Sequence, residues 1–202
     1  MVWDTVLGIG AVDAEAVWDE WLRITRFLEA ARLAFAREAE LWTSLETVEP
    51  VTLDVTTSKG RYRVDVADHL TAVQDDETLL ASVLIHTYAL AESAAVDHLS
   101  IGARDLGGIE DWGDRLLASE NRSWRDLQDG LAGAVEVAVV RNAFAHGQRT
   151  IDASGERRLR AAGVSSWSAG DSVSLTYDQL QVYRRCLRHM LGLAGIRRAT
   201  RT

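Results

Sequence analysis

The apolar residues of this chain recur at intervals of three and four along most of its length, which is the period of an α-helix with one buried face. The first such segment covers residues 13–45 and ends before Pro50, the only proline. Segments with the same period follow at residues 76–101, 109–118, 123–146 and 176–195. The pattern predicts a mostly α-helical protein with four main helices and one short helix.

One segment follows a different period. Apolar residues alternate with polar ones on both sides of a short turn at residues 57–60. Alternation of this kind is typical of paired strands, so the segment predicts a β-hairpin inserted after the first helix. The alternating residues are Val51, Leu53 and Val55 before the turn and Tyr62, Val64 and Val66 after it.

Capping residues indicate where the later helices begin and end. Ser123 with Asp126 resembles the capping box that opens a helix, and Thr176 with Gln179 forms a second one. Gly147 is the kind of residue that ends a helix in the left-handed conformation. These signals predict a third main helix from Ser123 to Gly147 and a last helix from Thr176. The polar segment 148–174 predicts a loop or weak strands.

The length of 202 residues predicts a single domain over residues 1–202, with a helix and hairpin in 1–66 and a core in 75–195. The single cysteine, Cys186, excludes an intramolecular disulfide and suits a reducing compartment. No basic residue precedes the first apolar stretch, and no apolar run approaches the roughly 20 residues of a membrane-spanning helix. We therefore expect a cytoplasmic protein without a membrane segment.

Charge is distributed unevenly along the chain. The net charge is -8, but residues 1–120 carry 9 Arg and Lys against 23 Asp and Glu, whereas residues 121–202 carry 13 Arg against 7 Asp and Glu. The net charge of +6 on residues 121–202 can attract a polyanion although the whole protein is acidic. The same arginines can equally form a solvated surface. The candidate phosphate contacts are Arg157, Arg158 and Arg160, followed by Arg184, Arg185 and Arg188.

The end of the third main helix carries Arg141, Asn142 and His146. An arginine offers a fixed fork of donors to a phosphate, a histidine can move a proton near neutral pH, and a carboxamide can orient either one. Asn142 and His146 are four residues apart and share a helix face. This set is what phosphodiester cleavage without a metal requires. A purely structural role is also open, in which His146 caps the helix and Arg141 pairs with a carboxylate such as Glu136 or Glu92.

The spacing from Arg141 to His146, with a polar residue directly after the arginine, resembles the R-x4-6-H signature of the HEPN superfamily. The resemblance extends over about residues 75–195, because a helix, a short helix, the motif helix, a variable loop and a final helix follow in the order of that family. It implies an antiparallel helical bundle with the hairpin as an insertion. In some HEPN toxins a tyrosine stands two residues after the histidine and is modified by a partner protein. Here that residue is Gln148, so the resemblance does not extend to this mode of regulation.

The resemblance implies a metal-independent endoribonuclease of toxin or defence type, with no cofactor, no metal, an RNA substrate and an antitoxin protein as a further partner. His146 would act as general base or acid, Arg141 would neutralise the phosphate oxygens, and Asn142 would position either group. The alternative is a HEPN-like interaction or scaffold module without catalysis, and a third reading is a helical antitoxin or sensor.

A homodimer is expected because many HEPN nucleases pair two protomers so that their motifs face each other. A second copy would supply a second imidazole and a second arginine beside His146. The motif helix gives a separate reason. The motif helix is apolar around much of its circumference, because Val137, Val140 and Phe144 continue away from the stripe at residues 131–138. Such a helix is buried on more than one side, and two-fold association is a common way to bury the second side. The alternative is that another part of the same chain covers it.

Overall fold

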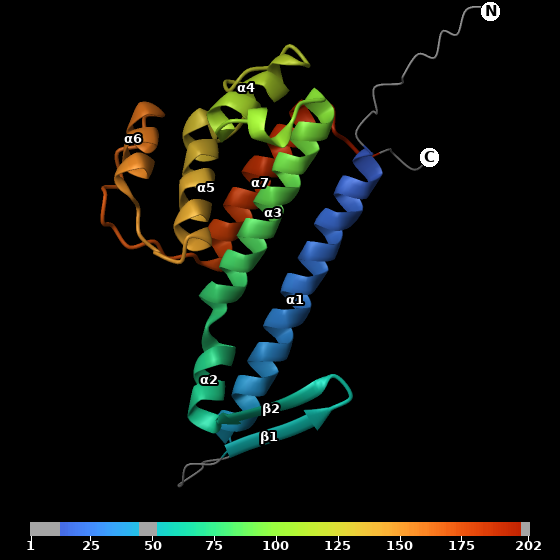
Figure 1. Cartoon of the computed structure of the whole chain (residues 1–202), viewed down its shortest axis with the longest axis vertical. Coiled ribbons are helices and arrows are strands. Elements are labelled where there is room, and N and C mark those ends of the chain that lie inside the picture. The colour runs from blue at the N-terminus through green and yellow to red at the C-terminus, as the bar shows by residue number, and fades with distance from the viewer. Residues whose placement is uncertain (1–12, 45–51, 199–202) are drawn as a thin grey trace, which may run out of the picture.

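The computed structural model describes residues 13–44 and 52–198, and these residues are mostly helical with a two-stranded antiparallel hairpin (Figure 1). The mostly α-helical character predicted from the sequence is therefore confirmed. The elements are α1 (Ala14–Ser44), β1 (Thr52–Thr57), β2 (Gly60–Asp65), α2 (Val66–Gln74), α3 (Asp76–Leu99), a 3-10 turn (Ala103–Asp105), α4 (Ile109–Ala118), α5 (Gly130–Ala145), α6 (Ala153–Ala161) and α7 (Tyr177–Leu193).

Helix α3 is the centre of the bundle, because α1, α4, α5 and α7 all pack against it. Its buried residues lie on several sides of the helix, as a central position requires. By length and composition α3 could also cross a membrane, since an 18-residue window has a mean hydropathy of 1.5, and 56% of that window is buried inside the protein. The expectation that no segment reaches this length was wrong for α3, and its central position explains the apolar composition.

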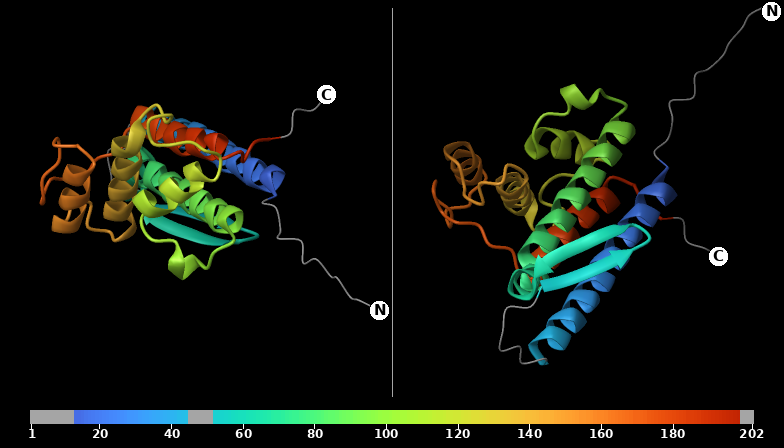
Figure 2. Two further views of the ribbon diagram at one scale, coloured as in Figure 1. Left: turned by 90° about the horizontal axis from the view of Figure 1, so that it is seen from above. Right: turned by 60° about the horizontal axis from the view of Figure 1, so that its bottom comes forward.

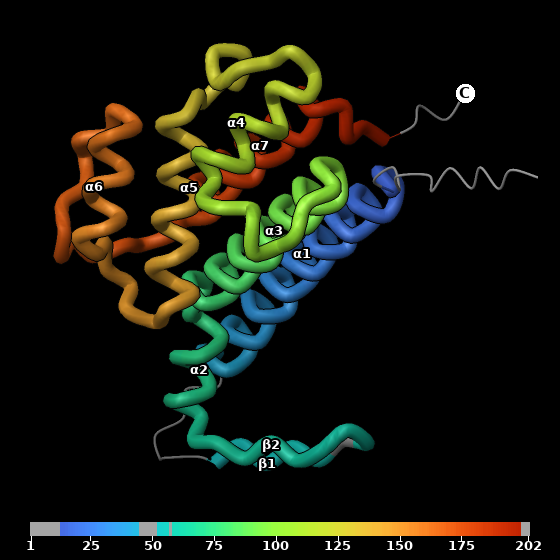
Figure 3. The backbone as a smooth tube through the Cα atoms, turned by 45° about the horizontal axis from the view of Figure 1, so that its top comes forward, coloured from blue at the N-terminus to red at the C-terminus, as the bar shows by residue number. Residues whose placement is uncertain are grey.

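The helices lie side by side across the bundle, from one flank of the molecule to the other. All views place α6 on one flank and α1 on the opposite flank, with α3, α5 and α7 between them (Figure 2). Helix α1 continues beyond the bundle, and there α2 and the hairpin pack near its end (Figure 3). The two flanks of the molecule are thus built from different parts of the sequence.

The hairpin pairs β1 with β2 through the predicted turn, with Val55 opposite Tyr62. Val51 lies outside the described residues, and Val66 begins α2 instead of continuing the strand. The buried ring of His69 joins the three neighbouring elements, because its Nδ1 lies 3.2 Å from the Tyr62 hydroxyl and its Nε2 lies 3.1 Å from Glu38 Oε1 on α1. This junction fixes the hairpin to the end of α1.

The sequence patterns predicted neither α2 nor α6. Helix α2 buries Val66, His69 and Val73, which have helical spacing in a segment too short to stand out beside the strands. Helix α6 lies inside the segment 148–174 that was predicted as a loop or weak strands. It buries only Gly155 and Leu159, so its apolar pattern is weak and it depends on packing against α5.

The third main helix begins later than predicted. The Asp126 carboxylate accepts the backbone N–H of Ser123 at 2.8 Å, but these residues form a turn that is not continued as a helix. Gly130, with φ of 60°, then reverses the backbone, and α5 starts there. The capping box at Thr176 and Gln179 was predicted correctly, since each side chain accepts a backbone N–H of the other residue.

Candidate functional site

The motif lies at the carboxyl end of α5. His146 is the last residue of the helical turn, and its N–H donates to the Asn142 carbonyl at 3.0 Å. Gly147 follows with φ of 69°, which confirms the predicted left-handed helix end. The His146 side chain is exposed and Asn142 is half-buried. The helix end thus presents the imidazole to solvent at the point where the chain turns toward α6.

Asn142 and His146 line one small pocket of about 90 Å³ between the end of α5 and the start of α6. Arg158 of α6 lines the same pocket, so residues that carry a guanidinium, a carboxamide and an imidazole border one cavity. Gly155 allows this close approach, because a Cβ at that position would lie 2.8 Å from Val139 Cγ1 of α5. The remaining residues that line the pocket are polar for the most part, among them Gln148, Thr150, Asp152 and Ser154.

Arg141 does not line this pocket, because its side chain is turned toward α3. Its Nη1 donates to Asn142 Oδ1 at 2.8 Å, its Nη2 lies 3.5 Å from Glu92 Oε2, and its guanidinium lies 4.8 Å from the ring centre of Tyr88. The side chain is 23% exposed. Burial raises the pKa of Glu92 above its ordinary value, and Arg141 opposes that shift. Arg141 is therefore placed to hold Asn142.

The cation at the pocket is Arg158, which sequence reasoning grouped with Arg157 and Arg160. Arg158 donates through Nε and Nη2 to the two carboxylate oxygens of Glu110 on α4, at 2.7 and 2.8 Å. Burial is the largest single influence on Glu110 and opposes its ionisation, but the hydrogen bonds and the charge of Arg158, together with a backbone hydrogen bond, outweigh it and lower the pKa of Glu110. Arg157 and Arg160 instead are exposed, and Arg160 pairs with Glu156 on its own helix. Recognition of α6 as a helix would have separated these arginines, since Arg158 shares a face with buried Leu159 and Gly155.

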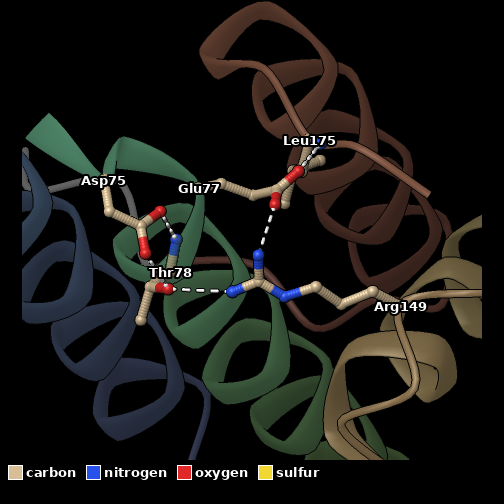
Figure 4. Close-up of polar contacts among 5 residues, drawn as sticks. All are labelled: Asp75, Glu77, Thr78, Arg149 and Leu175. Carbon is tan, nitrogen blue, oxygen red and sulfur yellow. Dashed lines mark hydrogen bonds and ion pairs between the residues drawn. The ribbon is translucent and has the colours of Figure 1, made fainter. Parts of the chain in front are cut away.

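The segment after His146 is fixed by Arg149, a residue that sequence reasoning missed. Its guanidinium donates to Glu77 Oε2 at 2.9 Å and to Thr78 Oγ1 at 3.0 Å, both at the start of α3 (Figure 4). The other carboxylate oxygen of Glu77 accepts the backbone N–H of Leu175 at 3.0 Å. Asp75 caps α3 and also accepts the Thr78 hydroxyl. No local signal marks this network, because its members come from three distant segments.

A second basic surface lies between α1 and α7. A groove of about 700 Å³ there is lined by Arg185 and Arg188, with Trp18 and Trp21 of α1. Arg184 is buried beside it and donates to Thr25 Oγ1 at 2.6 Å, so this arginine supports packing. The arginines predicted as a second phosphate-contact group are thus divided between a structural role and the groove.

The apolar side of α5 that suggested a dimer is covered within the chain. Val137, Val140 and Phe144 are at most 9% exposed, and α3, α4, α6 and α7 pack around the helix. The prediction that α5 is buried on more than one side is correct, but no second copy is needed to bury it. The apolar residues of α5 therefore do not indicate a dimer at the motif.

Within residues 13–44 and 52–198, no three His, Cys, Asp or Glu side chains gather in a way that could hold a metal ion. Comparisons of the chain with protein-family models, with curated proteins and with solved structures gave no match.

Proposed function

We propose that this protein is a metal-independent endoribonuclease of toxin or defence type, related to the HEPN nucleases that its motif resembles. The observation that carries the proposal is the pocket lined by Asn142, His146 and Arg158, which are residues of the three types that phosphodiester cleavage needs. The exposed imidazole at the pocket suits a group that exchanges protons with substrate and solvent.

In the proposed reaction the 2′-oxygen of RNA attacks the neighbouring phosphorus, and the bond from phosphorus to the 5′-oxygen breaks. His146 accepts the proton of the 2′-hydroxyl, and the departing 5′-oxygen takes a proton from His146 or water. The products are a 2′,3′-cyclic phosphate and a 5′-hydroxyl. Arg158 donates to the phosphate oxygens through Nη1, because its Nε and Nη2 are bound to Glu110, and so neutralises the charge that develops there.

Arg141 acts in this proposal as a positioning residue. The hydrogen bond from its Nη1 to Asn142 Oδ1 fixes the carboxamide, so that the Asn142 NH₂ group is directed away from the arginine. Contact of Arg141 with the phosphate would require the arginine to leave Glu92 and Tyr88. Replacement of Arg141 with Lys should therefore impair cleavage less than replacement of Arg158 with Lys, which keeps a charge but loses the fork.

The test is cleavage of RNA by the purified protein in the presence of EDTA. His146→Ala should lower the rate by about 10²–10⁴-fold, the usual contribution of a general acid or base. His86→Ala is the matched control, because His86 is exposed on α3 outside the pocket. Equal activity of the wild-type and His146→Ala proteins, or products with a 3′-hydroxyl, would contradict the mechanism.

The second candidate is a HEPN-like interaction or scaffold module without catalysis. The contacts of Arg141 with Glu92 and Tyr88 favour it, because they give the arginine of the motif a packing role. In that case the wild-type protein would not cleave RNA with or without divalent metal, and Arg141→Ala would lower its thermal stability more than His146→Ala. The antitoxin expected for a toxin belongs to the first candidate only.

A further inference from the structure

Helix α1 carries a second apolar face that the described part of the chain leaves open. Phe27, Leu33 and Leu41 are 56%, 54% and 52% exposed, and they are the most exposed large apolar side chains among the described residues. The small residues Ala30 and Ala34 are exposed between them. We call these five residues the outer face of α1. Exposed apolar residues gathered on one side of a helix mark an interaction surface.

The outer face is distinct from the side that packs in the bundle. Trp21, Ile24 and Leu28 are buried on the inner side of the same helix. Phe27, Ala34 and Leu41 repeat every seven residues and Ala30 follows Phe27 by three, the spacing of a seam along which a helix can pair with another helix, and Arg37 stands on the same seam. Helix α1 forms a flank of the molecule (Figure 1).

The charges beside the seam identify the partner. Arg26 and Glu40 lie seven residues before and after Leu33, and none of the ion pairs among the described residues includes either of them. If a two-fold axis passes beside Leu33, Arg26 of one copy faces Glu40 of an antiparallel second copy, and Leu33 meets Leu33. The same register places Ala30 against Ala34 and Phe27 against Arg37, where a cation–π contact can form. In a parallel pair of α1 helices, Arg26 of one copy would not face Glu40 of the other.

We propose that two copies of this chain associate through the outer face of α1, in antiparallel register about Leu33. The charges beside the seam are complementary between the two copies, which is what a two-fold interface requires. It lies on the flank opposite α6, so the pocket with Asn142 and His146 stays open in each copy (Figure 2). The proposal does not rest on the proposed function, and it differs from a dimer at the motif because α5 is not in the interface.

Light scattering of the full chain at micromolar concentration tests the association. The expected mass is about twice 22.3 kDa. Leu33→Glu should give a monomer with unchanged helical content by circular dichroism, because Leu33 makes no contribution to the core. Val182→Glu is the matched control, since Val182 is 39% exposed on α7 and its replacement should leave the mass doubled.

Three further variants test the register. Arg26→Glu should raise the dissociation constant at least tenfold, and Arg26→Glu combined with Glu40→Arg should restore it. Leu33→Cys should form a disulfide between copies under mild oxidation, whereas Cys186 is buried and should not react. A monomeric wild-type chain, a Leu33→Glu protein that remains dimeric, or a double variant no tighter than Arg26→Glu would overturn the proposal.

Discussion

Arg149 and Glu77 are separated by 72 residues in the sequence, and their side chains meet across 2.9 Å (Figure 4). The pair joins the segment after His146 to the first turn of α3. Because Glu77 also accepts the N–H of Leu175, the same carboxylate holds the segment that enters α7. The position of the pocket thus depends on contacts made outside it.

We predict that Arg149→Gln loosens the segment after the motif. The loss of hydrogen bonds to Glu77 and Thr78 should lower the free energy of unfolding by about 1 kcal/mol, since the arginine is half-exposed. Amide exchange at residues 147–151 should accelerate. Arg160→Gln serves as the control, because it removes a surface pair within one helix. Equal exchange rates in the two variants would show that Arg149 does not hold this segment.

Glycine replacements should separate close packing from helix propensity. Gly155→Ala should destabilise the protein and displace α6 from α5, because the new Cβ would lie 2.8 Å from Val139 Cγ1. Gly192→Ala meets no atom within 4 Å and should be neutral or stabilising by up to about 1 kcal/mol. Thermal unfolding of both variants measures the contrast. Loss of stability in Gly192→Ala together with a neutral Gly155→Ala would be the opposite of this expectation.

Salt dependence of RNA binding should distinguish the two basic surfaces. Under the proposed function, Arg157→Ser with Arg160→Ser should weaken binding and reduce the slope of log K against log salt by about 1–2, depending on how many phosphates the two arginines contact. Arg185→Ser with Arg188→Ser removes the same charge at the groove between α1 and α7, and it should leave the slope nearly unchanged. A larger effect of the second pair would place the RNA on the α1 and α7 side.

The pair of Glu110 and Arg158 should make stability depend on acid pH. The pKa of Glu110 is lowered in the folded protein from an ordinary value of 4.5. The stabilisation by this carboxylate is therefore fully present above pH 4.5 and is lost as the pH falls through the folded pKa. Urea unfolding between pH 3 and 6 should show a shallower loss of stability in Glu110→Gln than in the wild type. Parallel curves would mean that another carboxylate controls this range.

The sequence alone determined the elements whose signals are local. The period of the apolar residues predicted α1, α3, α4, α5 and α7, and alternation predicted the hairpin, because each pattern reports the buried face of one element. The left-handed Gly147 and the capping box at Thr176 could also be predicted from the sequence, since a cap is made by residues within one turn. Arg141, Asn142 and His146 could likewise be placed at a helix end.

Only the tertiary structure decided which of these side chains share a site. It turned Arg141 toward Glu92 and brought Arg158 to the pocket of Asn142 and His146, although the sequence offered three neighbouring arginines as equals. It also formed α6, whose few apolar residues become buried only against α5. The physical reason is that helix direction, burial and charge pairing between distant segments depend on packing, and no local pattern records which face of one helix meets another.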